Sequence, residues 1–365
     1  MMLPKLPLLG FGAMRLPTLG KDDMIDIPQV SKMADHYLAS GLNYFDTAYP
    51  YHGSKSEGAL MEAVVKRRAR DSFMLADKLP MWHINGEGDA PRLFAEQLGR
   101  LSVDYIDFYM MHGMNKSRIP IAKKNKVFEY LKRLKGEGKV RHIGFSFHDD
   151  AECIHMVMDA FPEMEFAQMQ LNYYDIILGH AGDILEAAVS RGVPVIAMEP
   201  VRGGTLANLP AKCAELITNR SPGATAASLA LRYVMSLPGV CMTLSGMSNL
   251  AQVEENCATV SDFSPTGEDD DKLIKDILKE LGRESAVPCT ACNYCAEGCP
   301  AGIEIPKAFS MHNMAKRTND SWNPGVMYRS IPEGKRAKDC TSCGKCKPLC
   351  PQGIDIPAEL SKITF

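Results

Sequence analysis

The sequence predicts an α/β fold, a (β/α)8 TIM barrel, followed by a small and mainly α-helical domain. Over about the first 260 residues, short apolar runs alternate with amphipathic helix-like segments, which is the pattern of parallel strands joined by crossover helices. No G-x-G-x-x-G motif follows the first apolar run, which argues against a doubly wound dinucleotide-binding sheet. Eight of the 12 cysteines lie after residue 288, so the end of the chain differs in character from the rest.

The expected elements follow from this alternation, because short apolar runs predict strands and amphipathic segments predict helices. We expect strands at 8–11, 43–46, 73–78, 106–112, 142–145, 166–171, 193–198 and 241–244. We expect helices between them at 29–39, 57–68, 90–101, 128–135, 151–160, 183–191 and 224–235.

A polar break separates the predicted barrel from the rest of the chain. It spans residues 261–267, and four acidic residues follow it at 268–271. Carboxylates are favourable in the first turn of a helix, so we expect a helix there that continues to about residue 281. The predicted domains are a barrel at 1–260, a linker with one helix at 261–287 and a cysteine-rich domain at 288–365.

Composition and charge exclude several classes of partner. The chain is 45% hydrophobic and 23% charged, as in soluble globular proteins. A net charge of −3 gives no reason to expect nucleic acid or an anionic membrane as a partner. The first residues lack the apolar core of a signal peptide, and no apolar stretch approaches the roughly 18 residues of a membrane span. We therefore expect a cytoplasmic protein.

Three expected strands each end on an ionisable side chain. The second ends in Asp46, with Tyr51 shortly after it, the third ends in Lys78 and the fourth ends in His112. In a parallel barrel these strand ends meet at one rim, where the active sites of such barrels lie. Each residue alone has an ordinary explanation as a turn, cap or core residue. The prediction of an active site therefore depends on the ordered set of four.

These four groups suit the reduction of a carbonyl group. A tyrosine with a pKa near 10 is a poor proton donor at neutral pH. We expect the Lys78 ammonium to lower the pKa of Tyr51, and the Asp46 carboxylate to hold Lys78 in place. His112 is expected to hydrogen-bond the substrate oxygen and orient it.

Over roughly residues 6–260, the chain resembles the aldo-keto reductases, which are (β/α)8 barrels. The resemblance rests on the ordered motif Asp46-Thr47-Ala48, Tyr51, Lys78 and His112. It implies an oxidoreductase in which Tyr51 is the general acid/base. It also implies a nicotinamide cofactor and a small-molecule carbonyl substrate.

The same resemblance implies nucleotide contacts on the later strand ends. A serine after the fifth strand and two amides after the sixth correspond to the nicotinamide site. An arginine and two glycines after the seventh correspond to a pyrophosphate loop, and the segment after the eighth corresponds to an adenosine-phosphate site at a helix N-terminus. The residues are Ser146, Gln170, Asn172, Arg202, Gly203, Gly204, Ser245, Gly246, Ser248, Gln252, Glu255 and Asn256.

Two positions depart from the family pattern. Phe147 stands where the family usually has an asparagine, and Gln252 stands where members that prefer NADPH carry an arginine. An uncharged amide cannot form the charge-assisted contact that arginine makes with a 2′-phosphate. Gln252 therefore argues against the NADPH preference of the family, and Phe147 lacks a polar contact to the nicotinamide, so NADH, NADPH and a flavin all stay open as cofactors.

The substrate pocket is expected to be shaped by the loops at 79–88, 112–124 and 173–179. Tyr49, Trp82 and Phe147 are candidate apolar walls. These walls suit a cyclic or aromatic carbonyl, an enone or a sugar, so they do not select a substrate.

The cysteine-rich domain contains one motif twice. Cys289-x2-Cys292-x2-Cys295-x3-Cys299-Pro is repeated as Cys340-x2-Cys343-x2-Cys346-x3-Cys350-Pro, and each copy continues into G-I-[ED]-I-P. This is the bacterial ferredoxin spacing, in which the fourth cysteine serves the other cluster. Zinc sites more often use separated C-x2-C pairs, and disulfides are rare in cytosolic proteins. We therefore expect two [4Fe–4S] clusters.

By resemblance to two-cluster ferredoxins, Cys289, Cys292, Cys295 and Cys350 hold one cluster, and Cys340, Cys343, Cys346 and Cys299 hold the other. The connection between the motifs is longer than in small ferredoxins, and we expect a helix at 307–316. Basic residues surround the second motif and either dock an acidic ferredoxin- or flavodoxin-like carrier or compensate the negative charge of the clusters. They are Lys335, Arg336, Lys338, Lys345 and Lys347.

Three functions remain open. The first is an oxidoreductase that reduces a carbonyl or enone, or runs in reverse, with the clusters transferring electrons. A nicotinamide moves two electrons and a cluster moves one, so this version needs a flavin in the barrel or an external donor. The second is an NAD(P)H-dependent carbonyl reductase whose clusters are structural or redox-regulatory. The third is a non-catalytic redox-sensing subunit, which the complete set of four rim residues argues against.

Overall fold

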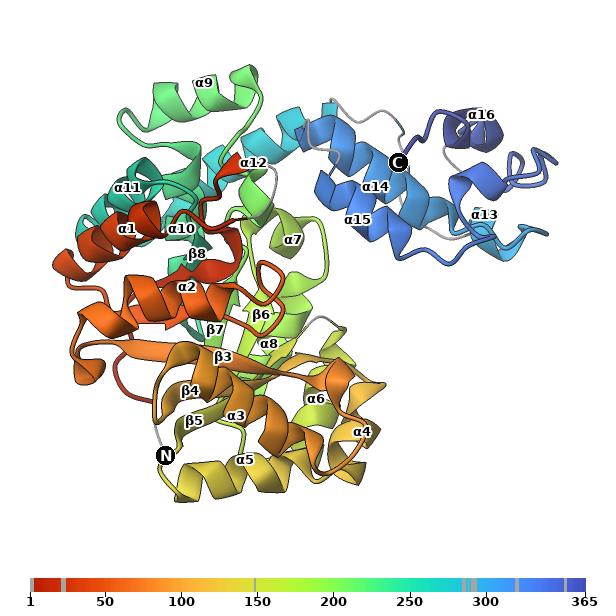
Figure 1. Ribbon diagram of the computed structural model, residues 1–365. Helices are drawn as coiled ribbons and strands as arrows, with labels where there is room; N and C mark the ends of the chain where they lie inside the picture. Colours follow the sequence, from red (N-terminus) through yellow and green to blue (C-terminus); the bar gives the residue numbers. More distant parts are fainter. Residues whose placement is uncertain are drawn as a thin grey trace. The chain divides into compact units, whose positions relative to one another are not determined.

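Eight parallel strands close into a barrel with helices on its outside, which confirms the predicted fold class (Figure 1). The computed structural model describes residues 3–20, 24–147, 149–283, 287, 289, 294–318, 322–350 and 353–365. Each strand pairs with its sequence neighbours, and the last strand pairs with the first. The strands are β1 Leu9–Gly12, β2 Tyr44–Asp46, β3 Met74–Pro80, β4 Ile106–Met114, β5 Val140–Phe147, β6 Phe166–Gln170, β7 Val195–Met198 and β8 Val240–Gly246.

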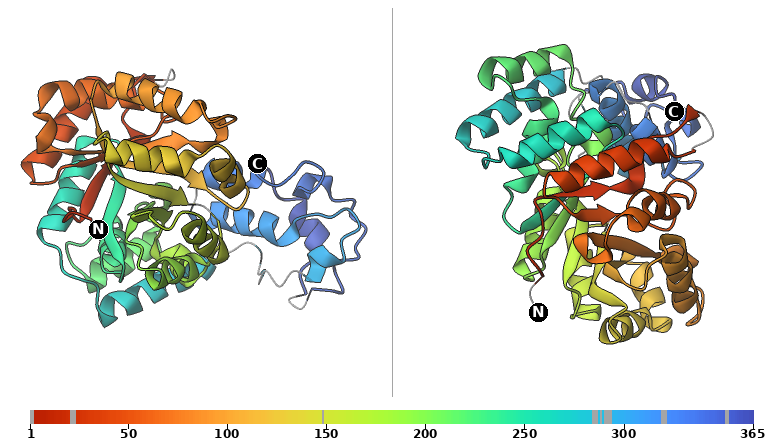
Figure 2. Two further views of the ribbon diagram at one scale, coloured as in Figure 1. Left: turned by 90° about the horizontal axis from the view of Figure 1, so that it is seen from below. Right: turned by 60° about the vertical axis from the view of Figure 1, so that its left-hand side comes forward.

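The helices of the barrel lie between its strands, as the alternation predicts (Figure 2). Several begin at a side-chain cap: Asp26 accepts a hydrogen bond from the backbone of Gln29, and Asp150 accepts one from Cys153. The helices are α1 Ile27–Ala39, α2 Ser56–Ala63, α3 Asp89–Leu101, α4 Arg118–Lys124, α5 Val127–Gly136, α6 Ala151–Ala160, α7 Tyr173–Ile177, α8 Ala181–Ser190, α10 Ala226–Met235 and α11 Leu250–Ser261.

Some boundaries differ from those expected. The helix expected at 57–68 ends at Ala63 and is followed by a separate 3-10 turn at Val65–Arg67. The fifth strand starts earlier and ends later than expected, at Val140 and Phe147. Helices α4 and α7 were not expected, because each occupies part of a loop and is too short to show helical periodicity.

Strand alternation connects the barrel core to the rim. Successive side chains of a strand point to opposite faces, so one alternate set points into the barrel. Buried residues of this set pack together inside it: Tyr44, Ala76, Phe108, Met110, Phe166, Ile196, Met242 and Leu244. Continuing the same alternation toward the strand ends brings Asp46, Lys78 and His112 to the mouth of the barrel. The packing that fills the interior therefore also fixes which side chains reach the site.

The chain divides into two compact units, the first formed by residues 1–202 and 227–266 and the second by 203–226 and 267–365. The second contains α9 Ala211–Arg220 and α12 Glu268–Arg283, which are joined by an ion pair between Arg220 and Asp276 at 2.6 Å. It also contains α13 Tyr294–Glu297, α14 Ile305–Thr318, α15 Trp322–Arg329 and α16 Ile356–Leu360. The domain boundaries predicted at 260 and 287 stay a prediction.

The segments that follow the two cysteine motifs turn in the same way at one glycine each. Gly302 and Gly353 have φ of 63° and 65°, a region that glycine adopts without strain, and each donates its N–H to the last cysteine of its motif. The isoleucines that follow, Ile303 and Ile305 in the first copy, are buried in one core with their counterparts in the second. No helix among the described residues has the length and apolar character required to cross a bilayer.

One position in β5 tests the packing of the barrel interior. A Cβ atom at Gly144 would lie 2.6 Å from the backbone oxygen of Phe166, so we expect Gly144→Ala to destabilise the fold by about 1–3 kcal/mol. Gly99→Ala is the control, because a Cβ atom there has no neighbour within 4 Å and alanine favours the helix by about 0.5–1 kcal/mol. Urea midpoints followed by circular dichroism should shift in opposite directions. Equal midpoints for both variants would contradict the tight interior.

Candidate active site

A buried ion pair lies at the mouth of the barrel. The Lys78 ammonium donates to Asp46 Oδ1 at 2.6 Å and to the Thr47 backbone oxygen at 2.7 Å. Both side chains are almost fully buried, with relative exposures of 1% for Lys78 and 3% for Asp46. A buried charge is tolerated only when it is paired and hydrogen-bonded, so this geometry holds the ammonium in one position.

Tyr51 and His112 lie beside this pair. The Lys78 Nζ atom is 4.8 Å from the centre of the Tyr51 ring, and the two side chains hydrogen-bond. The Tyr51 and His112 rings meet edge to face, with centroids 6.1 Å apart. The Tyr51 backbone N–H bonds the oxygen of Ala48 at 3.1 Å, which is a turn that returns the phenol toward β3. The four residues named from the sequence are therefore brought together.

Burial and the neighbouring charges act in opposite directions on the pKa values of Tyr51 and Lys78. Burial raises the pKa of Tyr51 above its usual value of 10.0, and Lys78 opposes this without reversing it. This corrects our expectation of a net lowering, although Lys78 acts in the expected direction. Burial lowers the pKa of Lys78, but Asp46 and Tyr51 outweigh it and the net shift is upward. At neutral pH the pair is Lys78 ammonium and Tyr51 phenol, an arrangement that can donate a proton.

A second buried group lies behind Lys78 and was missed in the sequence. Asp77 accepts the backbone N–H of Lys78 at 2.8 Å and hydrogen-bonds Glu57, whose carboxylate pairs with Arg100 at 2.8 Å. Burial raises the pKa of Asp77 well above 3.8, and the neighbouring Glu57 charge adds to the rise. Because Arg100 compensates Glu57, Asp77 is the carboxyl group of this pair that holds a proton. Its position directly before Lys78 was the only signal.

The nicotinamide-site candidates meet at a residue that we did not predict. Asp175 accepts from the Gln170 and Asn172 side chains at 2.8 Å each, and from Arg202 at 3.0 Å. Asn172 in turn caps α7 by accepting the Asp175 N–H at 2.9 Å. The spacing of a cap and an acidic residue three positions later is a known helix-start signal that could have identified Asp175. The carboxylate fixes the orientation of all three candidates.

The remaining nucleotide candidates lie in three places: near the end of β5, along β8 and α11, and after β7. Buried Ser146 accepts the Gly113 N–H at 2.7 Å, and buried Ser245 accepts from Asn256 at 3.0 Å. Ser248 is exposed and donates its N–H to Gln252 Oε1 at 2.7 Å, so the amide of Gln252 closes this loop. Gly246 is the last residue of β8, and Glu255 lies within α11. Gly203 and Gly204 have φ of 66° and 97°.

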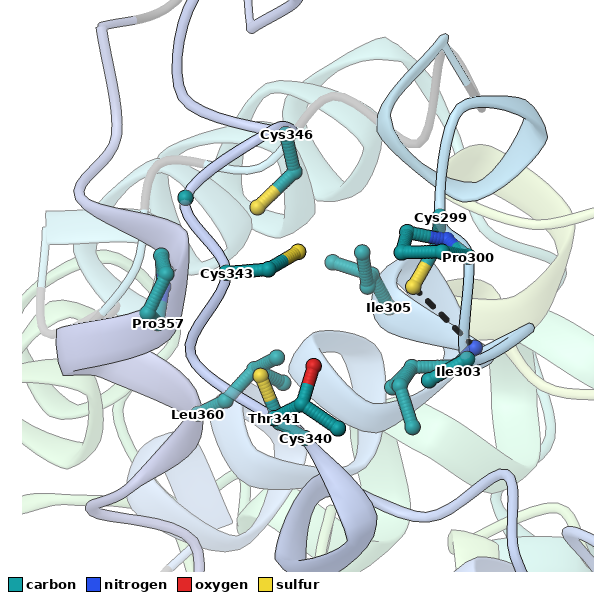
Figure 3. Close-up of a pocket in the computed structure, with 12 residues that line it drawn as sticks. Cys299, Pro300, Ile303, Ile305, Cys340, Thr341, Cys343, Cys346, Pro357 and Leu360 are labelled. Carbon is teal, nitrogen blue, oxygen red and sulfur yellow. Dashed lines mark hydrogen bonds between the residues drawn. The ribbon is translucent and has the colours of Figure 1, made fainter.

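Four cysteines of the second unit surround one pocket. Cys299 of the first motif faces it together with Cys340, Cys343 and Cys346 of the second (Figure 3). Apolar side chains, among them Ile303 and Leu360, form the walls. The sulfur atoms lie around the hollow instead of meeting at one point. This arrangement fits a cluster in which each of four iron atoms binds one thiolate.

The set expected to hold the other cluster is described in part. Cys289, Cys295 and Cys350 lie in the described part of the chain, and Cys292 lies outside it. The basic residues around the second motif are mostly exposed, with Lys347 bonded to Asp355 at 2.7 Å and Arg336 bonded to the backbone oxygen of Ile331 at 2.8 Å.

Asp77 gives a test of the buried carboxyl pair. A carboxyl group whose folded pKa is raised favours folding below its unfolded pKa of about 3.9, and this contribution is lost as pH rises above it. Asp77→Asn keeps the hydrogen-bonding shape without a charge. Its free energy of unfolding, relative to that of the wild type, should therefore increase as the pH rises from 4 to 8.

Asp77→Ala is the comparison, because it also lacks the carboxyl group but in addition loses the bonds to Lys78 and Glu57, so it should be about 1–3 kcal/mol less stable than Asp77→Asn at every pH. Urea unfolding across this pH range measures both. An Asn variant that follows the wild type in parallel would show that Asp77 is ionised.

Comparisons with known proteins identify the families to which the two parts of the chain are similar. The Aldo/keto reductase family matches residues 8–278, and a 4Fe-4S dicluster domain matches residues 288–354. L-galactose dehydrogenase of Arabidopsis thaliana is 27% identical over 74% of this chain and 89% of its own. A solved aldo-keto reductase from Bacillus halodurans is 24% identical, covers 74% of this chain and 91% of its own, and has a TM-score of 0.61.

An aldo/keto reductase from Klebsiella pneumoniae, solved with NADP and acetate, is 23% identical over 74% of this chain and 92% of its own, with a TM-score of 0.61. The cofactor in the Klebsiella pneumoniae structure is NADP, a nicotinamide. The family match covers most of the chain. The protein is therefore an oxidoreductase of the aldo/keto reductase family with a C-terminal 4Fe-4S dicluster domain.

Proposed function

We propose that the barrel reduces a carbonyl group, or oxidises the matching alcohol, at Tyr51 with a nicotinamide as hydride source. The observation that carries this proposal is the buried Lys78–Asp46 pair with Tyr51 and His112 against it. When bound, the nicotinamide supplies the hydride. The chain itself supplies the proton, the orientation of the substrate oxygen and the exclusion of water.

The proton in this proposal comes from the Tyr51 hydroxyl. Lys78 stabilises the phenolate that remains, and Asp46 keeps Lys78 charged and in place. His112 at the end of β4 lies across from Tyr51, where its ring can donate a hydrogen bond to the substrate oxygen. The phenol is thus kept protonated by burial until the developing alkoxide takes its proton.

The residues near the mouth fit a nicotinamide. Gln170 and Asn172 are amides held by Asp175, and amides of this kind can pair with a carboxamide. Solved structures of this fold contain NADP or NADPH. Gln252 offers no charge to a 2′-phosphate, so we propose that NADH and NADPH are both accepted.

The clusters are proposed to transfer single electrons, with Cys343 as the entry side. Cys343 is exposed, and the lysines at 335, 338, 345 and 347 around it are exposed too. A positive surface beside a cluster favours encounter with an acidic one-electron carrier. The second candidate is that the clusters are structural or regulatory, and it is favoured by the core that Ile303, Ile305, Ile354 and Ile356 form between the motifs.

Tyr51→Phe tests the assigned proton donor. We expect kcat/KM for NAD(P)H-dependent carbonyl reduction to fall by about 100-fold or more, because the ring stays and only the hydroxyl is lost. The visible absorbance of the clusters should be unchanged. Tyr130→Phe on α5, whose ring packs on Phe94, is the control and should keep full activity. Turnover of Tyr51→Phe close to that of the wild type would refute this role.

Anaerobic mixing separates the two roles of the clusters. Wild-type protein is mixed with NADH, NADPH and a chemically reduced acidic ferredoxin in turn, and the cluster absorbance is followed. Bleaching by the ferredoxin alone, with carbonyl turnover intact, is the expected result, because hydride and single electrons do not exchange directly. Bleaching by a nucleotide would instead require a mediator within the protein. No bleaching by any donor would favour structural or regulatory clusters.

A further inference from the structure

Arg118 is separated from the candidate catalytic histidine by one side chain, the ring of Trp82. Its guanidinium carbon is 5.4 Å from the centre of the Trp82 ring, and that ring is 4.9 Å from the ring of His112. Arg118 begins α4 and Trp82 follows β3, so two neighbouring βα loops bring them together. The cation therefore stands at the edge of the same site as Tyr51 and His112.

The backbone is shaped to admit this guanidinium. Gly113, directly after His112, has a φ of 62°, and its carbonyl oxygen accepts a hydrogen bond from Arg118. A Cβ atom at Gly113 would lie 2.7 Å from the Arg118 Nη1 atom, so a side chain at this position would displace the arginine. Ser146 holds the Gly113 N–H from the other side at 2.7 Å. The position of Arg118 is thus built into the end of β4.

Arg118 differs from the other cations of the barrel mouth in its charge balance. Arg202 pairs with Asp175, Arg15 with Glu199 and Lys116 with Asp150. Among the residues that the structure describes, Arg118 has no carboxylate partner, and its guanidinium contacts a backbone oxygen and the face of Trp82. Burial lowers its pKa, and no negative charge opposes this. Such a cation gains most from an oxyanion brought by a ligand.

We propose that Arg118 binds an acidic oxyanion group of the substrate, which makes the preferred substrates small carbonyl compounds that carry a carboxylate or a phosphate. In this arrangement the carbonyl end lies at Tyr51 and His112, the Trp82 ring packs on the carbon skeleton, and the guanidinium binds the acid. The proposal rests on the proposed function of the barrel and specifies its substrate class.

Matched substrates test the charge preference. The carboxylate 4-carboxybenzaldehyde is compared with the neutral 4-formylbenzamide, which has nearly the same shape, and 4-formylphenyl phosphate distinguishes phosphate from carboxylate. We expect the wild type to favour one of the acids in kcat/KM, and this ratio to fall about 10- to 100-fold in Arg118→Gln, chiefly through KM. Arg118→Lys should lie between the two, because it keeps the charge without the planar fork.

Lys116→Gln is the matched control, since this neighbouring cation already pairs with Asp150 and Glu152. It should leave the acid-to-amide ratio unchanged. A wild type without preference for either acid would overturn the proposal. An Arg118→Gln variant that loses equally on the acid and the amide would overturn it too, because that result indicates a structural role.

Binding without turnover separates this proposal from the proposed function. Benzoate and phenyl phosphate are titrated while the fluorescence of Trp82 is followed in a Trp322→Phe background, which removes the other tryptophan of the chain. Saturable quenching that disappears in Arg118→Gln supports the anion site even if no carbonyl is reduced. Quenching that is the same with and without Arg118 would overturn it.

Discussion

The ion pair between Lys78 and Asp46 is the interaction on which the candidate site depends. An ammonium with 1% exposure is stable only because a carboxylate and a backbone oxygen accept hydrogen bonds from it. This requirement ties β2 to β3 at the rim and sets the position from which Tyr51 can be polarised. Asp77 accepts the backbone N–H of Lys78 and hydrogen-bonds Glu57, so the backbone of Lys78 is held as well as its ammonium.

Sequence reasoning predicted the barrel, and it named four ionisable residues that the structure brings together at the rim, because both inferences depend on local patterns. Apolar runs identify strands, and a residue at a strand end is placed at the rim by topology alone. What the sequence could not show were contacts between segments far apart in the chain. Asp175 collects three side chains from two loops, and Arg118 reaches Trp82 across another loop. The predicted direction of the Tyr51 pKa shift was wrong for the same reason, since burial is a property of the whole fold.

The two parts of the chain pose different chemical problems. The barrel mouth keeps a phenol protonated and a lysine charged in a desolvated setting, which suits a two-electron hydride reaction accompanied by one proton. The cysteine pocket is lined by four cysteines, Thr341 and otherwise apolar residues, and Cys343 is exposed. An apolar shell with one open side suits a group that exchanges single electrons with an outside partner.

The placement of Cys299 also bears on how the second unit is assembled. This residue closes the first motif in sequence, yet it faces the pocket formed by the second motif. In the ligand sets that we propose, each motif gives its fourth cysteine to the other cluster, so the two halves would depend on each other for iron. Loading of iron would be cooperative in such a unit, and a chain that ended after the first motif would lack both sites. Biogenesis of the unit is thereby tied to completion of the whole C-terminal segment.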